Sequence, residues 1–277
     1  MTTSRPIVVK FGGELLDDPE RLAAVVDATR TIAARTPLVV VHGGGKEIDA
    51  ALKTAGIEKR QVDGLRITDA ATLGVVVAVL AGTINTRFVA ALNAAGVAAV
   101  GLTGADAGIG LSVQAPPHRS ADGRTMDLDR VGLPVAGSDV RLLDSLLRSG
   151  FVPVVACVGA AADGELFNVN ADTLAGHLAG RIGAARLVVA GTTPGVLDDG
   201  GQTIGMLDSA DVTRLVESGR ATAGMIAKLR ACESALAHRV DDVVIVDGRD
   251  GAQLIDAATP GREAPLRSTR LVRMVTA

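Results

Sequence analysis

The chain has 277 residues, which is enough for one large α/β domain or two smaller lobes around a sizeable core. Its formal net charge of −3 gives no general attraction for the phosphates of nucleic acid, which bind to a basic face. Aromatic residues make up 1% of the chain, without tryptophan or tyrosine, and this excludes stacking platforms for single-stranded nucleic acid.

Short, continuously apolar runs recur along the chain and predict parallel strands that are covered on both faces. They lie at residues 7–10, 38–41, 98–101, 152–155, 187–190 and 243–246. Helical patterns lie between them, at residues 19–34, 45–55, 70–95, 138–149, 171–182 and 223–237. This alternation predicts βαβ units and therefore an α/β fold, in which an open, mainly parallel sheet is sandwiched between helices in three αβα layers.

Two segments interrupt this alternation. Residues 111–137 contain prolines and an Asp-Gly pair, and we interpret them as a hairpin or excursion from the sheet. Residues 172–183 form a soft boundary, where a helix can join two lobes of one continuous sheet. We therefore expect an N-terminal lobe at residues 1–175 and a C-terminal lobe at residues 176–277.

The sequence does not indicate a membrane or an export signal. Between Asp69 and Asp106 the only charged residue is Arg87, but glycine, asparagine and threonine interrupt the segment, which we interpret as buried helix and strand. No apolar signal-peptide core precedes the first strand, and Cys157 and Cys232 show neither a pairing nor a metal-binding pattern. We expect a cytoplasmic protein with reduced thiols, without a nucleic-acid or membrane partner.

Glycines follow the first two predicted strands, at the edge where open parallel sheets bind ligands. Lys10 ends a buried strand and is followed by Gly12 and Gly13, so its ammonium can meet an anion beside exposed backbone N–H groups. A lysine that reaches solvent beside an ordinary turn explains the same pattern. His42 is followed by Gly43–Gly45 and a helix, which is an arrangement that binds anions, or otherwise a tight turn beside a structural histidine.

Polar side chains also precede three of the predicted helices. Arg66 lies near Thr68 and Asp69, which can cap the next helix, and its planar fork suits a carboxylate. Asn168 and Asp172 belong to a segment that follows the fourth predicted strand and opens a helix, which Asn170 can cap. Each of these residues also has an ordinary explanation, as a surface arginine or as a helix cap.

Two further short segments lie in the second half of the chain. Lys228 stands in an otherwise apolar helix start, and residues 191–196 follow the fifth predicted strand, where their backbone can hold a nucleotide. A solvated lysine and a plain loop are the alternatives. The G-x-G-x-x-G and G-x-x-x-x-G-K-[ST] spacings are absent, so neither a dinucleotide fingerprint nor a Walker-type site is expected.

Taken together and in this order, these segments resemble the amino-acid kinase family and, within it, the acetylglutamate kinases. The matching pieces span nearly the whole chain: V-V-K-F-G-G at 8–13, V-V-V-H-G-G-G at 39–45, G-L-R-I-T-D at 64–69, A-G-T-I-N at 81–85, F-N-V-N-A-D at 167–172, P-G-V-L-D at 194–198, G-M-I-A-K at 224–228 and V-D-G-R at 246–249.

The resemblance implies a role for each matched residue. Lys10 and Lys228 would neutralise charge on the transferring phosphoryl group, and Asp172 would hold both lysines. Four residues would bind the acetylated amino acid: Gly44, Gly45, Arg66 and Asn168. Phosphates and nucleotide would lie against a further set: Gly12, Gly13, Thr192, Thr193, Pro194, Gly195, Val196, Arg220, Ala221 and Thr222. No protein metal ligand is implied, because Mg²⁺ would arrive with ATP.

The implied reaction is ATP-dependent phosphorylation of the side-chain carboxylate of N-acetyl-L-glutamate to an acyl phosphate, in arginine biosynthesis. The alternatives are a kinase for carrier-linked aminoadipate or glutamate, and a catalytically weak sensor that binds the amino acid. Residues 191–195 lack the aspartate that the family usually has there, which affects the nucleotide site. The tail at residues 268–274 matches the family only loosely.

The resemblance also implies an assembly and a regulatory property. The uncharged first half of the helix at residues 70–95 predicts a homodimer, with Val75, Val76, Val79 and Leu80 near a two-fold axis. Burial of this helix within the single chain is the alternative. Only residues 1–6 precede the first strand, in place of the N-terminal helix of arginine-regulated members, so we expect weak feedback inhibition or none.

Overall fold

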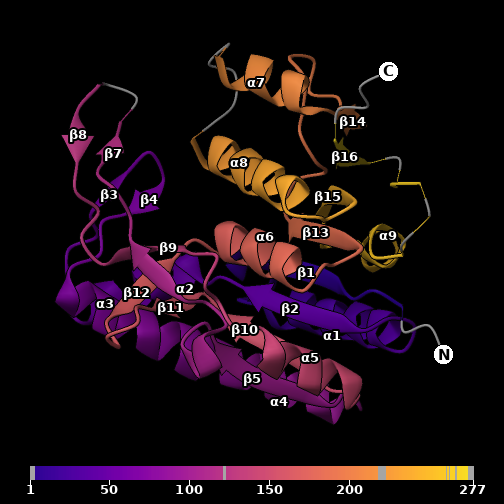
Figure 1. Cartoon of the computed structure of the whole chain (residues 1–277), viewed down its shortest axis with the longest axis horizontal. Coiled ribbons are helices and arrows are strands. Elements are labelled where there is room, and N and C mark those ends of the chain that lie inside the picture. The colour runs from indigo at the N-terminus through magenta and orange to yellow at the C-terminus, as the bar shows by residue number, and fades with distance from the viewer. Residues whose placement is uncertain are drawn as a thin grey trace.

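The computed structural model describes residues 4–120, 123–217, 223–259, 261, 263–265 and 267–273. Its centre is an eight-stranded sheet in the order β14-β16-β15-β13-β1-β2-β10-β5 (Figure 1). The strands are β1 (Ile7–Phe11), β2 (Leu38–His42), β5 (Ala99–Thr103), β10 (Val152–Ala156), β13 (Arg186–Gly191), β14 (Met206–Leu207), β15 (Asp242–Asp247) and β16 (Ser268–Val272).

The six predicted strands are all present and pair in parallel, in register, from β5 to β15. In β1 and β2 every residue is buried, which confirms that their continuous apolar sequence belongs to a sheet covered on both faces. Two strands of the eight-stranded sheet were not predicted. β16 pairs antiparallel with β15, and its polar sequence carries no continuous apolar run, while β14 contains only two residues.

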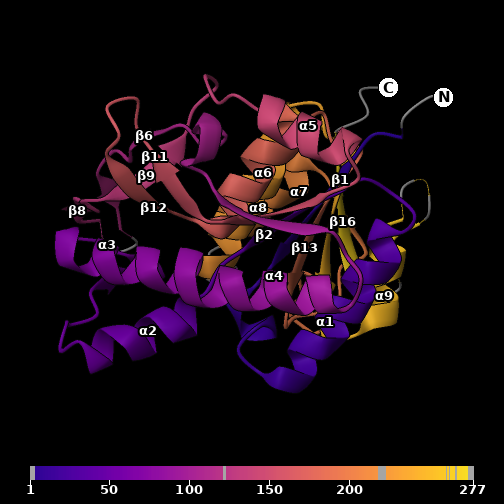
Figure 2. The same ribbon diagram turned by 90° about the horizontal axis from the view of Figure 1, so that it is seen from below.

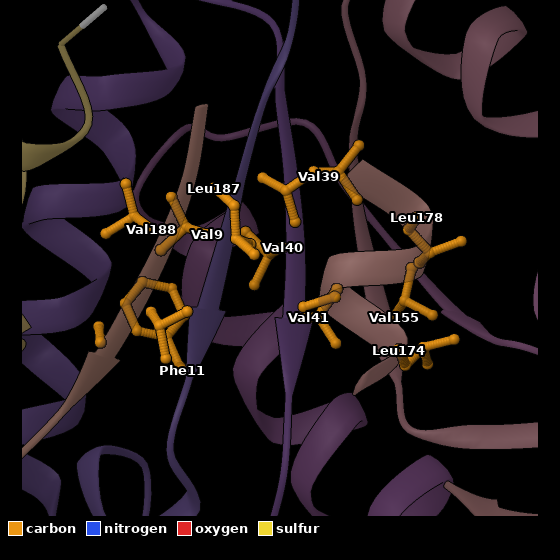
Figure 3. Packing of buried hydrophobic residues seen from close by; sticks show 14 of the residues in the cluster. Val9, Phe11, Val39, Val40, Val41, Val155, Leu174, Leu178, Leu187 and Val188 are labelled. Atoms are coloured by element: carbon orange, nitrogen blue, oxygen red, sulfur yellow. The ribbon is translucent and has the colours of Figure 1, made fainter. Parts of the chain in front are cut away.

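Helices cover both faces of the sheet (Figure 2). One layer contains α1 (Pro19–Ala33), α4 (Asn85–Ala94) and α9 (Gly251–Ala257), and the other contains α5 (Arg141–Arg148), α6 (Ala171–Arg181) and α8 (Ala223–Ala237). Near the sheet centre, Val41 and Val155 lie beside Leu174 and Leu178 of α6 (Figure 3). The predicted three-layer α/β fold is therefore confirmed. The start of α5 differs from the prediction, since the helix begins at Arg141 rather than at residue 138.

The long apolar segment forms one continuous helix built from α3 (Ala70–Val77), a π-helical stretch η2 (Ala78–Ile84) and α4. By length and composition alone it could cross a membrane, although 39% of its most apolar window is buried inside the fold. Core helices of globular proteins share this composition. Since α4 packs against β5 and α1, the interpretation of the segment as a buried core helix is the one that the fold supports.

Of the four residues predicted to lie near a two-fold axis, three are buried within the single chain. Val76, Val79 and Leu80 are 0%, 7% and 1% exposed, so they cannot present a free surface to a second copy, whereas Val75 is partly exposed. The helix leaves small residues exposed instead, among them Gly74, Ala78 and Gly82. The error has a simple physical reason: this helix is covered by α2 (Gly45–Thr54) in addition to the sheet, and the sequence did not reveal that second cover.

The predicted excursion is confirmed as a group of short strands beside the main sheet. β6 (Ser112–Gln114), β9 (Val131–Pro134), β11 (Val158–Ala160) and β12 (Leu166–Val169) form a four-stranded sheet. Two hairpins, β3 (Gln61–Val62) with β4 (Leu65–Arg66) and β7 (His118–Arg119) with β8 (Thr125–Met126), stand side by side at the left of Figure 1. The 2.8 Å contact of His118 Nε2 with Asp63 Oδ2 joins them.

This small sheet corrects the expected position of Asn168. The sequence placed it in a segment that directly follows the fourth predicted strand, whereas β11 and β12 intervene and Asn168 lies on β12, opposite Val158. The main sheet has two halves that meet where β1 pairs with β13. The strands formed by residues before 157 make up the half that contains β1, and the strands formed by later residues make up the half that contains β13. The division into lobes at residues 175 and 176 remains a prediction.

Candidate active site

The carboxylate of Asp172 lies between two lysines that are far from it in the sequence. Lys10 Nζ is 2.9 Å from Asp172 Oδ1, and Lys228 Nζ is 3.1 Å from Asp172 Oδ2. Lys10 comes from the carboxyl end of β1, Asp172 from the first turn of α6 and Lys228 from α8. The structure thus brings together the three residues predicted to carry the chemistry, and all three side chains are largely buried.

Local sequence fixes the position of Asp172. The side chain of Asn170 accepts a hydrogen bond from the Thr173 amide, which starts α6 as a normal N-cap and confirms the predicted cap. Asp172 therefore lies in the first helical turn, where the helix dipole also favours a carboxylate. Lys10 is held by the backbone pairing of β1 with both neighbouring strands, opposite Val41 and Val189.

The pKa values of the three groups show how strongly they are coupled. Burial would raise the pKa of Asp172, but the charges and hydrogen bonds of the two lysines lower it to about 2. Burial would lower the pKa of Lys10, yet Asp172 outweighs this and raises it. The pKa of Lys228 is lowered, by burial and by repulsion from Lys10. One carboxylate is thus shared by two cations, an arrangement that leaves excess positive charge for an anionic ligand.

The glycine-rich ends of β1 and β2 touch each other. A Cβ added to Gly13 would lie 2.6 Å from Gly44 Cα, so the two loops approach as closely as only glycines allow. Gly44 lies against the π-helical stretch, because a Cβ there would be 2.1 Å from Ile84 Cδ1. Gly45 starts α2 and has open space around the position of a Cβ. The N-terminus of α2 therefore opens beside the loop that follows Lys10.

The amide of Gly12 already has a partner, since it donates to the carbonyl of Ala190 at 2.9 Å. The role of this amide as a donor to phosphates stays a prediction. It would require the hydrogen bond to Ala190 to be replaced by one to a phosphate oxygen. The carboxylate of Glu14 lies against Gly12, because a Cβ on Gly12 would be 2.3 Å from Glu14 Oε1. Sequence reasoning missed Glu14, although its position directly after the two glycines was the available signal.

Arg66 has one engaged and one free nitrogen. Its Nη2 donates to Asp49 Oδ1 at 2.5 Å and lies 3.5 Å from the carbonyl of Gly45. Its Nη1 is buried and has no hydrogen-bond partner among the described residues. A buried donor without a partner is costly, so this nitrogen is positioned for an acceptor supplied by a ligand. Asp49 itself was missed by the sequence reasoning.

Two of the polar side chains singled out in the sequence, Asn168 and Asp69, lie next to Thr68. Asn168 Nδ2 donates to Thr68 Oγ1 at 3.0 Å, which brings β12 to the start of α3. Asp69 caps α3 by accepting from the Thr72 amide at 2.8 Å, which confirms the predicted cap. Asn168 and Arg66 thus both lie near the residues that join β4 to α3.

The second half of the chain contributes a cavity of about 530 Å³. Thr193, Gly195 and Val196 line it, together with the apolar side chains of Leu197, Ile204, Met206, Leu207, Leu215 and Met225 and the charged side chains of Asp198, Asp199, Asp211 and Arg214. The role of residues 192–196 in nucleotide binding stays a prediction. Thr192 does not line the cavity, and its carbonyl accepts a hydrogen bond from Arg249 Nη2. Pro194 is partly buried in the same loop. Arg220, Ala221 and Thr222 lie outside the described residues.

Thr269 of β16 holds the loop that lines this cavity. Its Oγ1 accepts from the Val196 amide at 2.7 Å, and a Cβ on Gly195, whose φ is +98°, would lie 2.4 Å from the same oxygen. The C-terminal strand therefore supports the cavity although its sequence resembles the family only loosely.

Comparison with known proteins supports the same reading. The model of the Amino acid kinase family matches residues 5–247. An acetylglutamate kinase from Granulibacter bethesdensis is 42% identical over 262 residues, covering 92% of this chain and 87% of the relative. An acetylglutamate kinase from Methanopyrus kandleri is 43% identical over 243 residues, covering 87% of this chain and 94% of the relative.

Solved structures show the same fold at lower identity. N-acetylglutamate synthase from Neisseria gonorrhoeae, complexed with coenzyme A and N-acetyl-glutamate, has a TM-score of 0.81 and 22% identity. The match covers 99% of this chain but 60% of the synthase chain. Carbamate kinase from Giardia lamblia, bound to AMP-PNP, has a TM-score of 0.70 and 12% identity, with 99% and 100% covered.

Fold and site together define an α/β protein whose buried Lys–Asp–Lys cluster and glycine loops are suited to a phosphate-bearing ligand. The chain belongs to the amino acid kinase family. The resemblance that was drawn from the motifs is thereby confirmed.

Proposed function

We propose that the protein is an acetylglutamate kinase, which transfers the γ-phosphoryl group of ATP to the side-chain carboxylate of N-acetyl-L-glutamate. The observation that carries this proposal is the pair of lysines on Asp172, at 2.9 and 3.1 Å. The names of the relatives at 42% and 43% identity support the choice of substrate. By the same analogy the reaction belongs to arginine biosynthesis in the cytoplasm.

The chemistry needs little covalent help from the protein. The substrate carboxylate is ionised at neutral pH and attacks the γ-phosphorus directly, while the bond to the bridging oxygen of ADP breaks, so no general base is required. The products are ADP and an acyl phosphate. Lys10 and Lys228 stabilise negative charge on the transferring group, and Asp172 keeps both ammonium groups in place.

Arg66 is the residue that we assign to the α-carboxylate of the amino acid. Its unpartnered Nη1 supplies a charged donor, while Asp49 fixes the other side of the guanidinium. Gly44 and Gly45 at the N-terminus of α2 provide a favourable place for a second anionic group. Asn168, which Thr68 holds, would hydrogen-bond the remaining polar part of the substrate.

The nucleotide is assigned to the cavity lined by Thr193, Gly195 and Val196. Its lining is mainly apolar but also contains Asp198, Asp199, Asp211 and Arg214, so the base would be held mainly by apolar contact and by backbone groups rather than by stacking. Among the described residues no group of three His, Cys, Asp or Glu side chains could hold a metal ion. Mg²⁺ would accordingly be bound mainly by the phosphates of ATP, whose charge it neutralises.

An assay of ATP turnover tests the proposal. We expect ADP release that depends on N-acetyl-L-glutamate and is accompanied by hydroxylamine-trapped acyl phosphate. Free glutamate and N-acetyl-L-aspartate are the control substrates. Turnover only with carrier-linked aminoadipate or glutamate would establish the first alternative, and binding of acetylglutamate without turnover would establish a sensor.

Assembly as a homodimer is part of the proposal. The outer face of the helix at residues 70–94 leaves Gly74, Ala78 and Gly82 exposed beside the edge strand β5. Small residues permit close approach of a second copy of the same helix. Sedimentation at micromolar concentration tests this, with Gly82→Arg as the interfering variant, and a wild-type monomer would contradict it.

A further inference from the structure

A second cavity, of about 510 Å³, lies away from the proposed substrate and nucleotide sites, and we call it the basic groove. It opens between the C-terminal ends of α6 and α8 and the segment that follows β9. Its charged or titratable lining residues are His177, Arg181, His238 and Arg239. None of the described residues that line it is acidic. Its volume is typical of a small-molecule site.

Hydrogen bonds fix part of the basic groove and leave the rest free. Ser138 Oγ donates to the carbonyl of Val135, so it accepts from His177 Nε2 at 2.8 Å. Arg181 Nη2 donates a hydrogen bond to the carbonyl of Ser138. His238 is bound through Nδ1 to the carbonyl of Ser234, which leaves its Nε2 for another partner. For the guanidinium of Arg239 the described residues supply no hydrogen-bond acceptor.

The positive charge exceeds what the two helix ends can balance. Each helix C-terminus carries an effective charge of about −0.5, so the two together offset about one of the two arginine charges. Asp139 interacts with Arg181 through its charge but is itself bound by Arg141, and Asp241 is bound by Arg5. Burial, together with the charges of Arg181 and His238, lowers the pKa of His177 to about 4.

Arg239 occupies a backbone position that favours glycine. It follows the end of α8 with φ at +74°, in the left-handed region where a helix usually ends on glycine. A residue with a Cβ costs about 1 kcal/mol or more there. The side chain of Arg239 lines the groove in spite of this cost, so the backbone at this position is held by the surrounding structure.

We propose that the basic groove binds a small oxyanion with two or more negative charges, such as a phosphate group or a polycarboxylate. Arg181 and Arg239 contact its oxygens, and His238 donates from Nε2 when it is protonated. The size of the groove limits the ligand to a metabolite rather than a polymer. The same two helices also carry Asp172 and Lys228, so a bound anion touches the elements that hold the reaction centre.

Imidazole NMR tests this directly, because the chain contains only four histidines. We would titrate inorganic phosphate, citrate and acetate at constant ionic strength and follow the resonances of each ring. Phosphate or citrate should shift the resonances of His238 and His177 in a saturable way, and should raise the pKa of His177 by ~0.5 unit or more, because a bound anion favours the charged imidazole. His42 and His118 should not shift. Whether phosphate or citrate binds more tightly identifies the class of oxyanion.

Two arginine variants provide the matched comparison. Arg239→Gly should weaken anion binding at least about tenfold, the loss of one charge-assisted hydrogen bond, while its thermal stability stays equal or rises, since glycine suits a φ of +74°. Arg230→Gln, on the exposed face of α8 outside the groove, removes the same charge and should bind normally. Unchanged binding in Arg239→Gly, equal shifts with acetate, or shifts confined to His118 would each overturn the proposal.

Discussion

The imidazole of His42 and the side-chain amide of Asn85 meet inside the protein, with His42 Nε2 3.0 Å from Asn85 Nδ2. Because the same Nδ2 also donates to the carbonyl of Val154 at 2.9 Å, the amide nitrogen faces the ring and His42 Nε2 must accept. The other ring nitrogen donates to the carbonyl of Gly43. His42 is therefore neutral, and this pair anchors the start of the glycine loop to the long helix.

This arrangement predicts a loss of stability in mild acid. Burial, with a smaller effect of Arg87, lowers the pKa of His42 to about 4. In the unfolded chain His42 binds a proton near pH 6.5, whereas in the folded protein it stays neutral down to about pH 4. The contribution of His42 to stability is therefore complete above pH 6.5 and is lost as the pH falls toward 4. The free energy of unfolding should drop by on the order of 3 kcal/mol from this residue. Urea unfolding across pH 4–7 measures it, and His42→Gln should show a shallower pH dependence than the wild type.

Removing either lysine from Asp172 should slow catalysis while the fold survives. In Lys10→Ala or Lys228→Ala the carboxylate keeps one partner, but one fixed charge on the phosphoryl group is lost, which typically costs ~10²–10³ in kcat. Steady-state kinetics with circular dichroism measures both effects. Lys53→Ala, on the exposed face of α2, is the matched control and should turn over normally. Near-wild-type turnover in either site variant would refute the assignment.

The substrate role of Arg66 predicts a selective effect on one KM. Arg66→Lys keeps the charge but loses the planar guanidinium, so the side chain can no longer hydrogen-bond Asp49 and the substrate carboxylate at the same time. The KM for acetylglutamate should rise by about 10–100-fold, as expected for a lost charged hydrogen bond. The KM for ATP should change little. Arg60→Lys, in the exposed segment before β3, serves as the control. Equal changes in both KM values would remove Arg66 from the amino-acid site.

A buried ion pair far from the site predicts a large loss of stability. Arg186 is 2% exposed and grips Asp242 with two nitrogens at 2.7 Å, while its third nitrogen donates to the carbonyls of Ala257 and Thr259. In Arg186→Ala the buried carboxylate of Asp242 keeps the partly exposed Arg270 as its charged partner among the described residues, and the substitution should cost about 3–5 kcal/mol. Denaturant unfolding measures this. Loss of the exposed Arg141–Asp139 pair should change stability little.

Much of the site was predictable because its signals are local. A lysine at the end of a continuously apolar strand, followed by two glycines, was compatible with a nearby anion, although a lysine that reaches solvent explained the same pattern, and Asn170 marked the start of the helix that carries Asp172. What was not predictable depends on long-range packing. The contact of Asn85 with His42, the hold of Asp49 on Arg66 and the burial of Val76 beneath α2 leave no periodic pattern in the sequence.

The two cysteines flank the Lys–Asp–Lys cluster and should be chemically inert in the folded protein. Cys157 is 4% exposed and Cys232 is 0% exposed, and burial raises the pKa of each thiol to about 12, despite the charges of the nearby lysines. At pH 8 the thiolate fraction is then roughly a thousandfold below that of an ordinary cysteine, before any steric exclusion is counted.

Labelling with a chromogenic disulfide reagent should be slow on the native protein and should reach two thiols on addition of guanidinium. Because the nucleophile is the thiolate, alkylating reagents should also leave turnover intact. Rapid native labelling at either cysteine, with or without loss of turnover, would show that the cluster is more open to solvent than its burial indicates.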